Sequence, residues 1–430
     1  MVVGRGVVDG YLAAEDVVSV LTRGLERLPL DGKRVLVLIP DGTRTMPVPL
    51  AFETLERRLA PRTAALDYLV ALGTHPPMSD AQLSRLVGRT VADGFAGGAR
   101  VFNHQWDDPA ALVQLGSIPA RDILALTGGR LREQVPVALN RLVVEYDHVL
   151  ICGPVFPHEV AGFSGGTKYL FPGIAAPAII HFTHWLGALM TNYAIVGTLE
   201  TPVRAVIDRA ASLLDTPVSL VAFVVTHEGT AGVFCGDTQD AWRQAAALSA
   251  RRHIVWVERP FDRVLSIMPP MYDDLWVAGK GMYKVEPVVA DGGEVIILAP
   301  HVAEVSHVHG AMIEEIGYHC CDYFVAQWDR FSRFPGGILA HSTHVKGLGT
   351  FDRESGRESG RIRVSLATAI TEERCARINL GYKNPADIDP SEWPTTLDER
   401  TLMVPRAGEL LFRVGSPPAS AALNDGAARL

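Results

Sequence analysis

Short apolar runs recur along the chain, and most of them end at a turn or at a loop rich in polar residues. Runs that indicate buried strands lie at 34–39, 66–72, 100–102, 147–152 and 218–226. Segments with helical spacing of apolar residues separate several of these runs. Strands that alternate with helices are typical of a parallel sheet with helices on both faces. The pattern therefore predicts an α/β fold.

Capping residues mark where some of the helices should begin. One helix is predicted to start near Leu50, a second follows Ser79-Asp80 and runs through residue 87, and a third starts at Asp237-Thr238 and reaches Arg252. Ser and Asp side chains accept hydrogen bonds from the free amides of a first helical turn. The sequence therefore predicts where these helices begin more precisely than where they end.

The strand pattern stops and starts again in the second half of the chain. New strands are predicted at 263–268, 294–299 and 361–367, with a charged loop at 352–360. We therefore predict two α/β domains with parallel-type sheets.

The boundary between the two predicted domains is set near residue 258. The N-terminal domain then covers 1–258 and the C-terminal domain covers 259–404. The tail, about 405–430, is interpreted as loosely packed, with the option of returning to the first domain. The active site is expected in the cleft between the domains, where ligand sites are common.

Composition and charge exclude some classes of partner. The chain has 430 residues, of which 48% are hydrophobic, and its formal net charge is -8. The absence of a basic excess argues against nucleic acid or an anionic membrane as the main partner. No apolar run reaches the ~18 residues of a membrane helix, and neither a signal peptide nor a disulfide framework is indicated. We expect a cytoplasmic protein.

Polar and ionisable residues are concentrated in loops that directly follow predicted strands. Three such loops begin at Asp41, Thr74 and Pro154. Because ligands of parallel sheets bind beyond the carboxyl ends of the strands, the three loops are expected to form one site. Asp41 and Arg44 suit a carboxylate or phosphate ligand, although an ordinary Asp-Gly turn explains them equally well. His75 suits acid-base work, with an exposed surface histidine as the alternative.

The segment 157–173 carries the strongest signal. It joins His158 to a Gly165-Gly166 turn and to Lys168, one of only six lysines in the chain. Its spacing excludes a Walker motif, and no dinucleotide-binding fingerprint is present. His181 and His184 follow at helical i, i+3 spacing, which fits either a metal site or a packed histidine pair.

Two of the four lysines of the second predicted domain, and two histidine pairs, are further candidates. Lys280 and Lys284 share one helical face, and one of them is expected to reach the interdomain cleft, while Lys284 is interpreted as a surface charge. The pairs His307/His309 and His341/His344 are interpreted as structural.

Together these stretches resemble the nickel-pincer nucleotide-dependent lactate racemase family. The matching elements are Asp41-Gly42-Thr43-Arg44, Gly73-Thr74-His75, the segment 158–173, His184, and the segment from Lys280 to Gly293. The resemblance implies that 1–258 binds the cofactor, a nickel-pincer nucleotide attached covalently to Lys168. Ser164, Gly165 and Gly166 would form the cofactor loop, and His184 would be the nickel ligand.

The resemblance also implies roles in the reaction. His75 and His158 would be the two acid-base groups, Arg44 and Lys280 would hold the substrate, and Asp41 would be the acid of the first loop. The implied activity is racemisation or epimerisation of 2-hydroxy carboxylic acids by reversible hydride transfer. The implied partners are a small hydroxy acid and cofactor-maturation proteins.

The chain departs from the family pattern at several positions. Pro76 and Thr167 stand where arginine is usual, and Thr45-Met46 separates Arg44 from the proline that usually follows it. Trp276-Val277 replaces a tyrosine and a glutamine, which predicts a larger or less polar pocket and argues against lactate itself as the substrate. Two alternatives stay open: a cofactor-free binding protein for hydroxy acids or sugar acids, and a His-ligated metallohydrolase.

Overall fold

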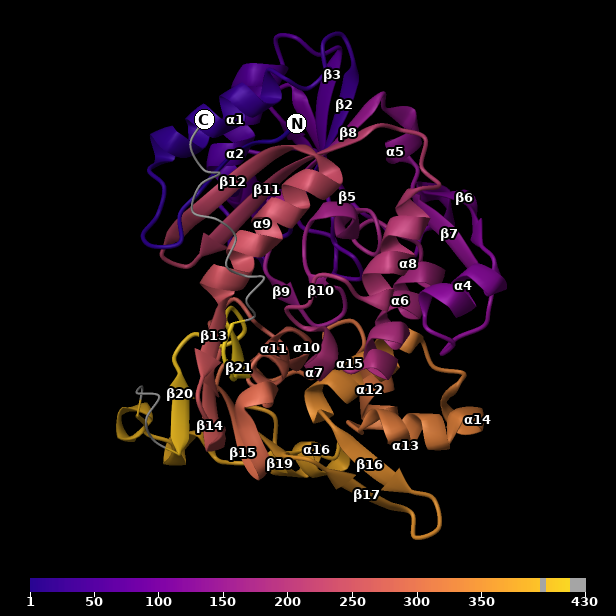
Figure 1. Cartoon of the computed structure of the whole chain (residues 1–430), viewed down its shortest axis with the longest axis vertical. Coiled ribbons are helices and arrows are strands. Elements are labelled where there is room, and N and C mark those ends of the chain that lie inside the picture. The colour runs from indigo at the N-terminus through magenta and orange to yellow at the C-terminus, as the bar shows by residue number, and fades with distance from the viewer. Residues whose placement is uncertain (395–399, 418–430) are drawn as a thin grey trace.

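The computed structural model describes residues 1–394 and 400–417 and has an α/β architecture built on two main sheets (Figure 1). The first part of the chain forms an eight-stranded sheet, and the second part forms a five-stranded sheet. Residue 258 lies between β13 (Ile254–Val257) and β14 (Phe261–Ile267), the first strand of the second sheet. The α/β fold predicted from the sequence is therefore confirmed.

The central strands of the first sheet run parallel to one another. They are β11 (Val218–Thr226), β8 (His148–Pro154), β2 (Arg34–Ile39), β3 (Ala65–Val70) and β5 (Ala99–Asn103), in that spatial order. Antiparallel strands complete both edges: β12 (Gly229–Asp237) and β1 (Val3–Gly6) on one side, and β4 (Phe95–Ala96) on the other. The predicted strand at 218–226 is confirmed.

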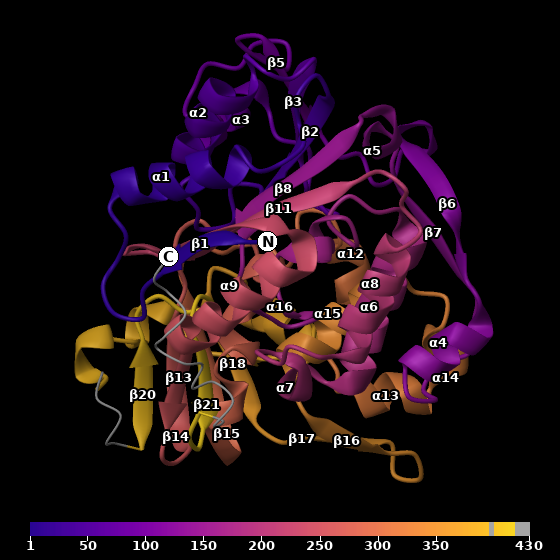
Figure 2. The same ribbon diagram turned by 45° about the horizontal axis from the view of Figure 1, so that its top comes forward.

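Helices cover both faces of this sheet because its strands are apolar on both sides. In β2, Val35 and Val37 pack with α1 (Ala14–Leu25) and α2 (Val48–Leu59), whereas Leu36 and Leu38 face the opposite cluster. That opposite cluster includes α6 (Pro177–Met190), α8 (Pro202–Ala211) and α9 (Thr238–His253). Figure 2 shows α1 and α9 on different sides of the sheet. Continuous apolar runs of this kind are expected in a sheet that is buried on both faces.

Two predicted helix starts agree with the structure. α3 (Asp80–Val87) begins after Ser79, whose hydroxyl accepts from Gln82 N in a capping box. α9 begins after Asp237, whose carboxylate accepts from the amides of Gln239 and Asp240. These capping bonds stabilise the helix starts, each by about 1 kcal/mol.

The second sheet is parallel throughout. Its order is β19 (Gly381–Tyr382), β18 (Arg363–Thr368), β15 (Val289–Ala299), β14 and β20 (Thr401–Val404). The charged segment 352–360 is not a simple loop as predicted, because β16 (Gly349–Asp352) and β17 (Arg357–Gly360) pair there as an antiparallel hairpin. Asp352 pairs with Arg357 in that register, so charged residues that read as a loop stabilise a short ribbon.

Several contacts join the two units. α15 (Gly336–Lys346) packs on α6, and a Cβ at Gly336 would lie 2.6 Å from the carbonyl oxygen of His181. β21 (Leu411–Val414) pairs in parallel with β13, and the two strands form a small sheet that is separate from both main sheets. Residues 418–430 of the predicted tail lie outside the described residues. The units therefore share a packed interface beside α6.

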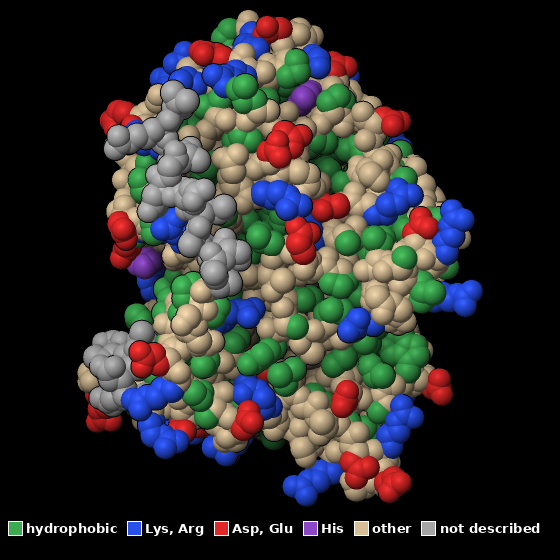
Figure 3. All heavy atoms as spheres, viewed as in Figure 1, with side chains coloured by type: hydrophobic (Ala, Val, Ile, Leu, Met, Phe, Trp, Pro, Cys, Tyr) green, Lys and Arg blue, Asp and Glu red, His purple; other side chains and the backbone are tan. Residues whose placement is uncertain are grey.

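Charged side chains are distributed over the surface. In Figure 3, Lys and Arg are interspersed with Asp and Glu over the face in view. No helix within residues 1–394 and 400–417 combines the length and the apolar character that crossing a bilayer requires.

Candidate active site

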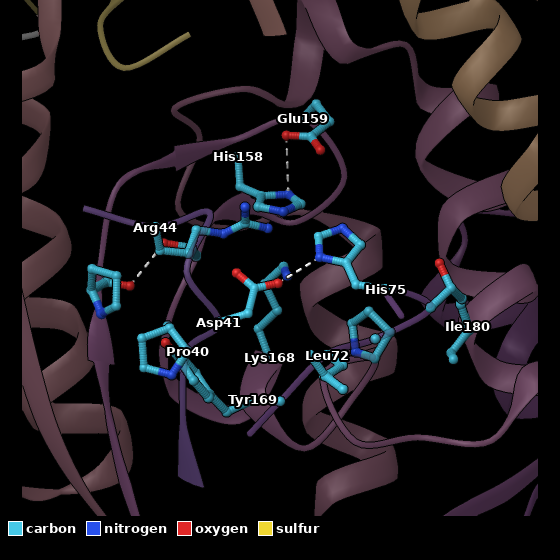
Figure 4. A pocket seen from close by; sticks show the side chains of 18 of the residues that line it. Pro40, Asp41, Arg44, Leu72, His75, His158, Glu159, Lys168, Tyr169 and Ile180 are labelled. Atoms are coloured by element: carbon cyan, nitrogen blue, oxygen red, sulfur yellow. Dashed lines mark hydrogen bonds and ion pairs between the residues drawn. The ribbon is translucent and has the colours of Figure 1, made fainter. Parts of the chain in front are cut away.

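The three polar loops that follow β2, β3 and β8 meet around one cavity of about 140 Å³ (Figure 4). Eight of the ten site residues predicted from the sequence line it: Asp41, Arg44, His75, His158, Ser164, Gly165, Lys168 and His184. The other two, Gly166 and Lys280, are not among the lining residues. The parallel sheet therefore brings together residues that are more than a hundred positions apart.

A larger cavity of about 700 Å³ adjoins the first and opens between the two units. The two cavities share six lining residues: Asp41, Arg44, Leu72, Thr74, His75 and Trp276. Asp273, His307 and His309 of the second unit form part of the wall of the larger cavity. The site thus lies in an interdomain cleft, as the fold predicted.

His75 is held by Asp41. Its Nδ1 lies 2.5 Å from Oδ2 of Asp41, and the carboxylate also accepts from the amide and the hydroxyl of Thr43, at 3.0 and 2.6 Å. Burial opposes the ionisation of Asp41, but His75, Arg44 and Thr43 together hold the pKa of that carboxyl well below its usual range. An ionised Asp41 keeps the proton of neutral His75 on Nδ1, which leaves Nε2 as a free base.

His158 lines the same cavity as His75 and has a different partner. Its Nδ1 accepts from the amide of Val160 at 3.1 Å and lies 3.5 Å from Oε2 of Glu159. Burial lowers the pKa of His158 well below 6.5, and Lys168 acts in the same direction while Glu159 opposes it. The ring is therefore neutral at physiological pH, so its contact with Glu159 is not an ion pair in that state.

Lys168 presents an amine to the cavity. The side chain is half-buried, and Nζ has no hydrogen-bond or ion-pair partner within the part of the chain that the structure describes. Burial lowers the pKa of Lys168 to about 8, with a further contribution from Arg44 that Glu159 opposes. About a tenth of the amine is thus unprotonated at pH 7, far more than for an exposed lysine, which favours reaction of Lys168 as a nucleophile.

The glycine turn before Lys168 needs residues without a side chain. Gly165 and Gly166 have φ values of 77° and 60°. A Cβ on Gly165 would lie 2.5 Å from Cγ2 of Val155, and one on Gly166 would lie 3.0 Å from the ring of Trp242. The turn is therefore restricted to glycine by both backbone conformation and space.

Three consecutive carbonyl groups of this turn are held from outside the cavity. Arg204 of α8 donates to the carbonyls of Phe163 and Gly165, and Trp242 of α9 donates to that of Ser164 at 2.8 Å. The guanidinium also lies 4.4 Å from the centre of the Trp242 ring. The sequence offered no signal for Arg204, because it lies 36 residues beyond Lys168 on a separate helix.

Thr167, at the position where arginine was expected, takes part in the same network. Its hydroxyl donates to Asp208 at 2.6 Å and accepts from Arg204 at 3.3 Å. Gln239 also donates to Asp208, at 3.1 Å. Position 167 therefore points away from the cavity toward α8, and a guanidinium is supplied there by Arg204.

His184 lies on α6 with one ring nitrogen already engaged. Its Nδ1 donates to the carbonyl of Ile180 at 2.7 Å, which leaves the lone pair on Nε2. Burial lowers the pKa of His184 to about 4, so the ring stays neutral and able to bind a metal. His181, its neighbour at i-3, lines neither cavity and packs against Trp106 instead.

These donors fit a tethered nickel cofactor. Within residues 1–394 and 400–417, no three His, Cys, Asp or Glu side chains are grouped so that they could share one metal ion. His184 would then be a single protein ligand, with the remaining donors coming from a group attached to Lys168. Lys168, whose amine would be the attachment point, and His184, whose imidazole would be the metal ligand, line the same cavity.

Lys280 and Lys284 of the second unit are both buried, so the prediction that Lys284 is a surface charge was wrong. Lys284 is 1% exposed, and its Nζ donates to the carbonyl of Pro157 at 2.5 Å. Lys280 is 8% exposed, and its Nζ lies 4.6 Å from the centre of the Tyr272 ring. Both belong to the segment around α11 (Lys280–Tyr283), which faces the first unit. The segment that the sequence suggested to be an exposed helix surface therefore lies in the interface between the two units.

Trp276 closes the cavity from the second unit. Its ring stacks on that of His341 at 4.2 Å and packs against that of His309 at 4.6 Å. His309 also lines the larger cavity and contacts Thr74 through Nε2 at 3.3 Å. Both members of one histidine pair that was interpreted as structural, His307 and His309, therefore line the larger cavity, which the sequence did not indicate.

Comparisons with known proteins agree with the resemblance seen in the sequence. Residues 17–197 match the lactate racemase N-terminal domain. The lactate racemase of Thermoanaerobacterium thermosaccharolyticum is 25% identical over 283 residues, which is 65% of this chain, and that of Lactiplantibacillus plantarum is 25% identical over 295 residues, or 64%. Each alignment spans 62% of the curated relative.

Solved structures extend the similarity to nearly the whole chain. A Thermotoga maritima protein of 32% identity superposes with a TM-score of 0.86, over 94% of this chain and 99% of that one. The lactate racemase apoprotein of T. thermosaccharolyticum, at 20% identity, superposes with a TM-score of 0.66 over 94% of this chain and 93% of that one. The chain is therefore a homologue of the lactate racemases: residues 17–197 match their N-terminal domain, and the chain shares the fold of the apoprotein.

Proposed function

We propose that this protein is a racemase or epimerase of 2-hydroxy carboxylic acids that uses a nickel-pincer nucleotide attached to Lys168. The observation that carries the proposal is a single cavity where two histidines face a free lysine amine and the free Nε2 of His184. The names of the two curated relatives support an isomerase activity.

The chemistry of a 2-hydroxy acid favours a hydride route. The C2 proton is very weakly acidic because the neighbouring carboxylate is already an anion. Removing the hydroxyl proton makes departure of a hydride from C2 easier, and the product is a planar 2-keto acid. A bound nickel-pincer nucleotide would supply the acceptor for that hydride and its return to either face. Atoms and electrons balance, since both the proton and the hydride are given back.

The chain's own residues would hold the substrate and move its proton. Arg44 borders both cavities and can bind the substrate carboxylate. The amine of Lys280 lies near Arg44, and its pKa, lowered by burial and by Arg44, would rise beside a bound carboxylate. Nε2 of His75 is free to take the hydroxyl proton, and Asp41 stabilises the imidazolium that forms. His158 would do the same from the other side for the opposite enantiomer.

The shape of the cleft supports a substrate larger than lactate. Trp276 stands at the junction of the two cavities, and the larger one offers about 700 Å³ beyond it. We infer that the substituent on C2 of the substrate extends into this space. Cofactor-maturation proteins would be the protein partners, because the nucleotide must be made and inserted by other enzymes.

Mass spectrometry combined with metal analysis tests the proposal. Protein made in a host that synthesises the cofactor should carry an adduct on Lys168 with about one nickel per chain, and should change the optical rotation of some 2-hydroxy acid. Lys168→Ala should lose the adduct and all turnover, whereas Lys33→Ala, which changes a lysine remote from both cavities, should keep both. Racemase activity in protein that carries neither the adduct nor nickel would refute the proposed cofactor. If neither the wild type nor Lys168→Ala shows turnover, but both bind the hydroxy acid, a binding protein would be favoured.

A further inference from the structure

Glu159 is an acidic group in a cavity that should bind an anion. Its side chain lines the cavity and is 18% exposed. Burial opposes its ionisation, but His158, Lys280 and Lys284 hold the pKa of the carboxyl well below its usual range. A negative charge at this place repels a substrate carboxylate, and the repulsion is strong where water is scarce. Glu159 therefore has to be explained by a group that it stabilises.

Besides the Tyr283 hydroxyl and the amines of Lys280 and Lys284, the ring of His158 is such a group. Nδ1 of that ring has a donor on one side, the amide of Val160 at 3.1 Å, and an acceptor on the other, Oε2 of Glu159 at 3.5 Å. A neutral imidazole carries one proton, which can lie on either nitrogen. The amide of Val160 favours the tautomer with the proton on Nε2, whereas the carboxylate of Glu159 favours the proton on Nδ1.

The choice of tautomer decides whether His158 can act as a base. With the proton on Nε2, no lone pair faces the cavity, so His158 cannot accept a proton from the substrate. With the proton on Nδ1, Nε2 is free in the same way as that of His75 beside Asp41. Only the second tautomer serves the proposed reaction.

We propose that Glu159 is a positioning residue that accepts the Nδ1 proton of His158, both when the ring waits as a base and when it is an imidazolium. This inference rests on the proposed function, and it gives each of the two histidines its own carboxylate. The proton path is balanced: Nε2 takes the substrate hydroxyl proton, Nδ1 keeps its own, and the same hydroxyl proton returns from Nε2 to the alkoxide.

Other charged groups around His158 act against its protonation. Lys168 follows on the glycine turn, Arg44 lies on the loop after β2, and Lys284 reaches in from α11, and all three lower the pKa of His158. Glu159 is the one group in that set that raises it. Lys284 also holds the carbonyl of Pro157, so the backbone that carries the ring and its carboxylate is fixed from the second unit.

Nitrogen NMR of the cofactor-free protein tests the proposal without any turnover. The ¹⁵N shifts of the His158 ring, assigned with the variant His158→Gln, report the tautomer directly at pH 7.5. We expect the Nδ1–H form in the wild type and a shift of about tenfold or more toward the Nε2–H form in Glu159→Gln. Glu159→Asp should restore part of the wild-type ratio. Glu409→Gln, which changes an acid paired with His227 at 3.5 Å outside both cavities, should leave it unchanged.

A second measurement in the loaded enzyme separates this inference from the proposed function. Glu159→Gln should lower kcat/KM about 10- to 100-fold with little change in KM, because a base is lost rather than a binding group. A wild-type ring held wholly as the Nε2–H form, or a tautomer ratio equal in wild type and Glu159→Gln, would overturn the role of Glu159. A normal tautomer result with no racemisation of any hydroxy acid would overturn the proposed function alone.

Discussion

Replacing Arg204 by methionine should loosen the turn that carries Lys168. The guanidinium donates to the carbonyls of Phe163 and Gly165 and to the hydroxyl of Thr167. Each buried acceptor that is left unpaired costs about 1–3 kcal/mol. Methionine fills a similar length of the buried site, so the loss is mainly one of hydrogen bonds and charge.

Part of that loss is offset. Arg204 is 3% exposed, its Nε has no partner, and burial lowers its pKa to about 10, with Asp208 opposing. Removing a buried charge therefore recovers some desolvation free energy, and a net loss of about 3 kcal/mol is reasonable for one broken buried network. For a domain of this size the loss lowers the thermal midpoint by about 6–12 °C.

Lys168 provides the second measurement on the same variant. The charge of Arg204 is one of the groups that lower the pKa of Lys168. Its removal should raise that pKa, so acylation of the amine at pH 7 should slow while that of exposed lysines stays the same. Calorimetry and competitive labelling read by mass spectrometry measure the two effects on cofactor-free protein.

Arg209→Met is the matched control on α8. Arg209 is 37% exposed in its side chain and contacts Ser212 at 3.0 Å and Asp122 at 3.8 Å, so its loss should cost no more than about 0.5 kcal/mol. Equal midpoints for the two variants, together with an unchanged labelling rate at Lys168, would refute the bracing role of Arg204.

Three other changes test the rest of the site. Asp41→Asn should lower kcat about 100-fold or more by removing the acceptor of the His75 proton. Folding lowers the pKa of Asp41, so the stabilisation from its ionised carboxylate is present above about pH 4 and is lost as the pH falls through the folded value. Asp41→Asn should therefore melt at a lower temperature than wild type at pH 7 but not in strong acid. Equal melting temperatures at pH 7 would contradict this. Acylation of Lys168 should follow a pKa of about 8, and a value above 10 would contradict its burial. Trp276→Tyr should change the ratio of kcat/KM for lactate to kcat/KM for a bulkier 2-hydroxy acid by about tenfold, because Trp276 lines the pocket. An unchanged ratio would show that Trp276 does not select the substrate.

Much of the fold could be predicted because the strands are buried on both faces. Runs such as 34–39 and 218–226 are apolar without interruption, and Asp237 caps the following helix in the way its sequence suggests. Strand β12, next to the edge strand β1, was missed because its glycines and polar residues weaken the apolar pattern. The hairpin β16–β17 was missed because paired charges read as a loop.

The site could be predicted where its residues lie at strand ends, and not where burial reverses the usual meaning of a residue. Asp41, His75 and His158 follow strands, so the parallel topology alone brings them together. Lys284 looks like a solvated charge until the carbonyl of Pro157, on the other unit, is found to bind it. Arg204 likewise has partners that only the folded chain supplies.

The balance of charge in the cleft links these residues to the proposed substrate. Arg44, Lys168, Lys280 and Lys284 lie near three acids, Asp41, Glu159 and Glu409, in a chain whose overall charge is negative.

Burial lowers the pKa of Lys284 to about 8, whereas Lys168 has no titratable amine once the proposed cofactor is attached to it. A carboxylate that enters beside Arg44 makes the protonated form of Lys284 more favourable, since opposite charges a few ångströms apart raise a lysine pKa. Binding near pH 8 is then coupled to uptake of a fraction of a proton by Lys284. The cleft therefore holds fewer permanent cations than its number of basic residues suggests, and Arg44 still discriminates a hydroxy acid from a neutral alcohol.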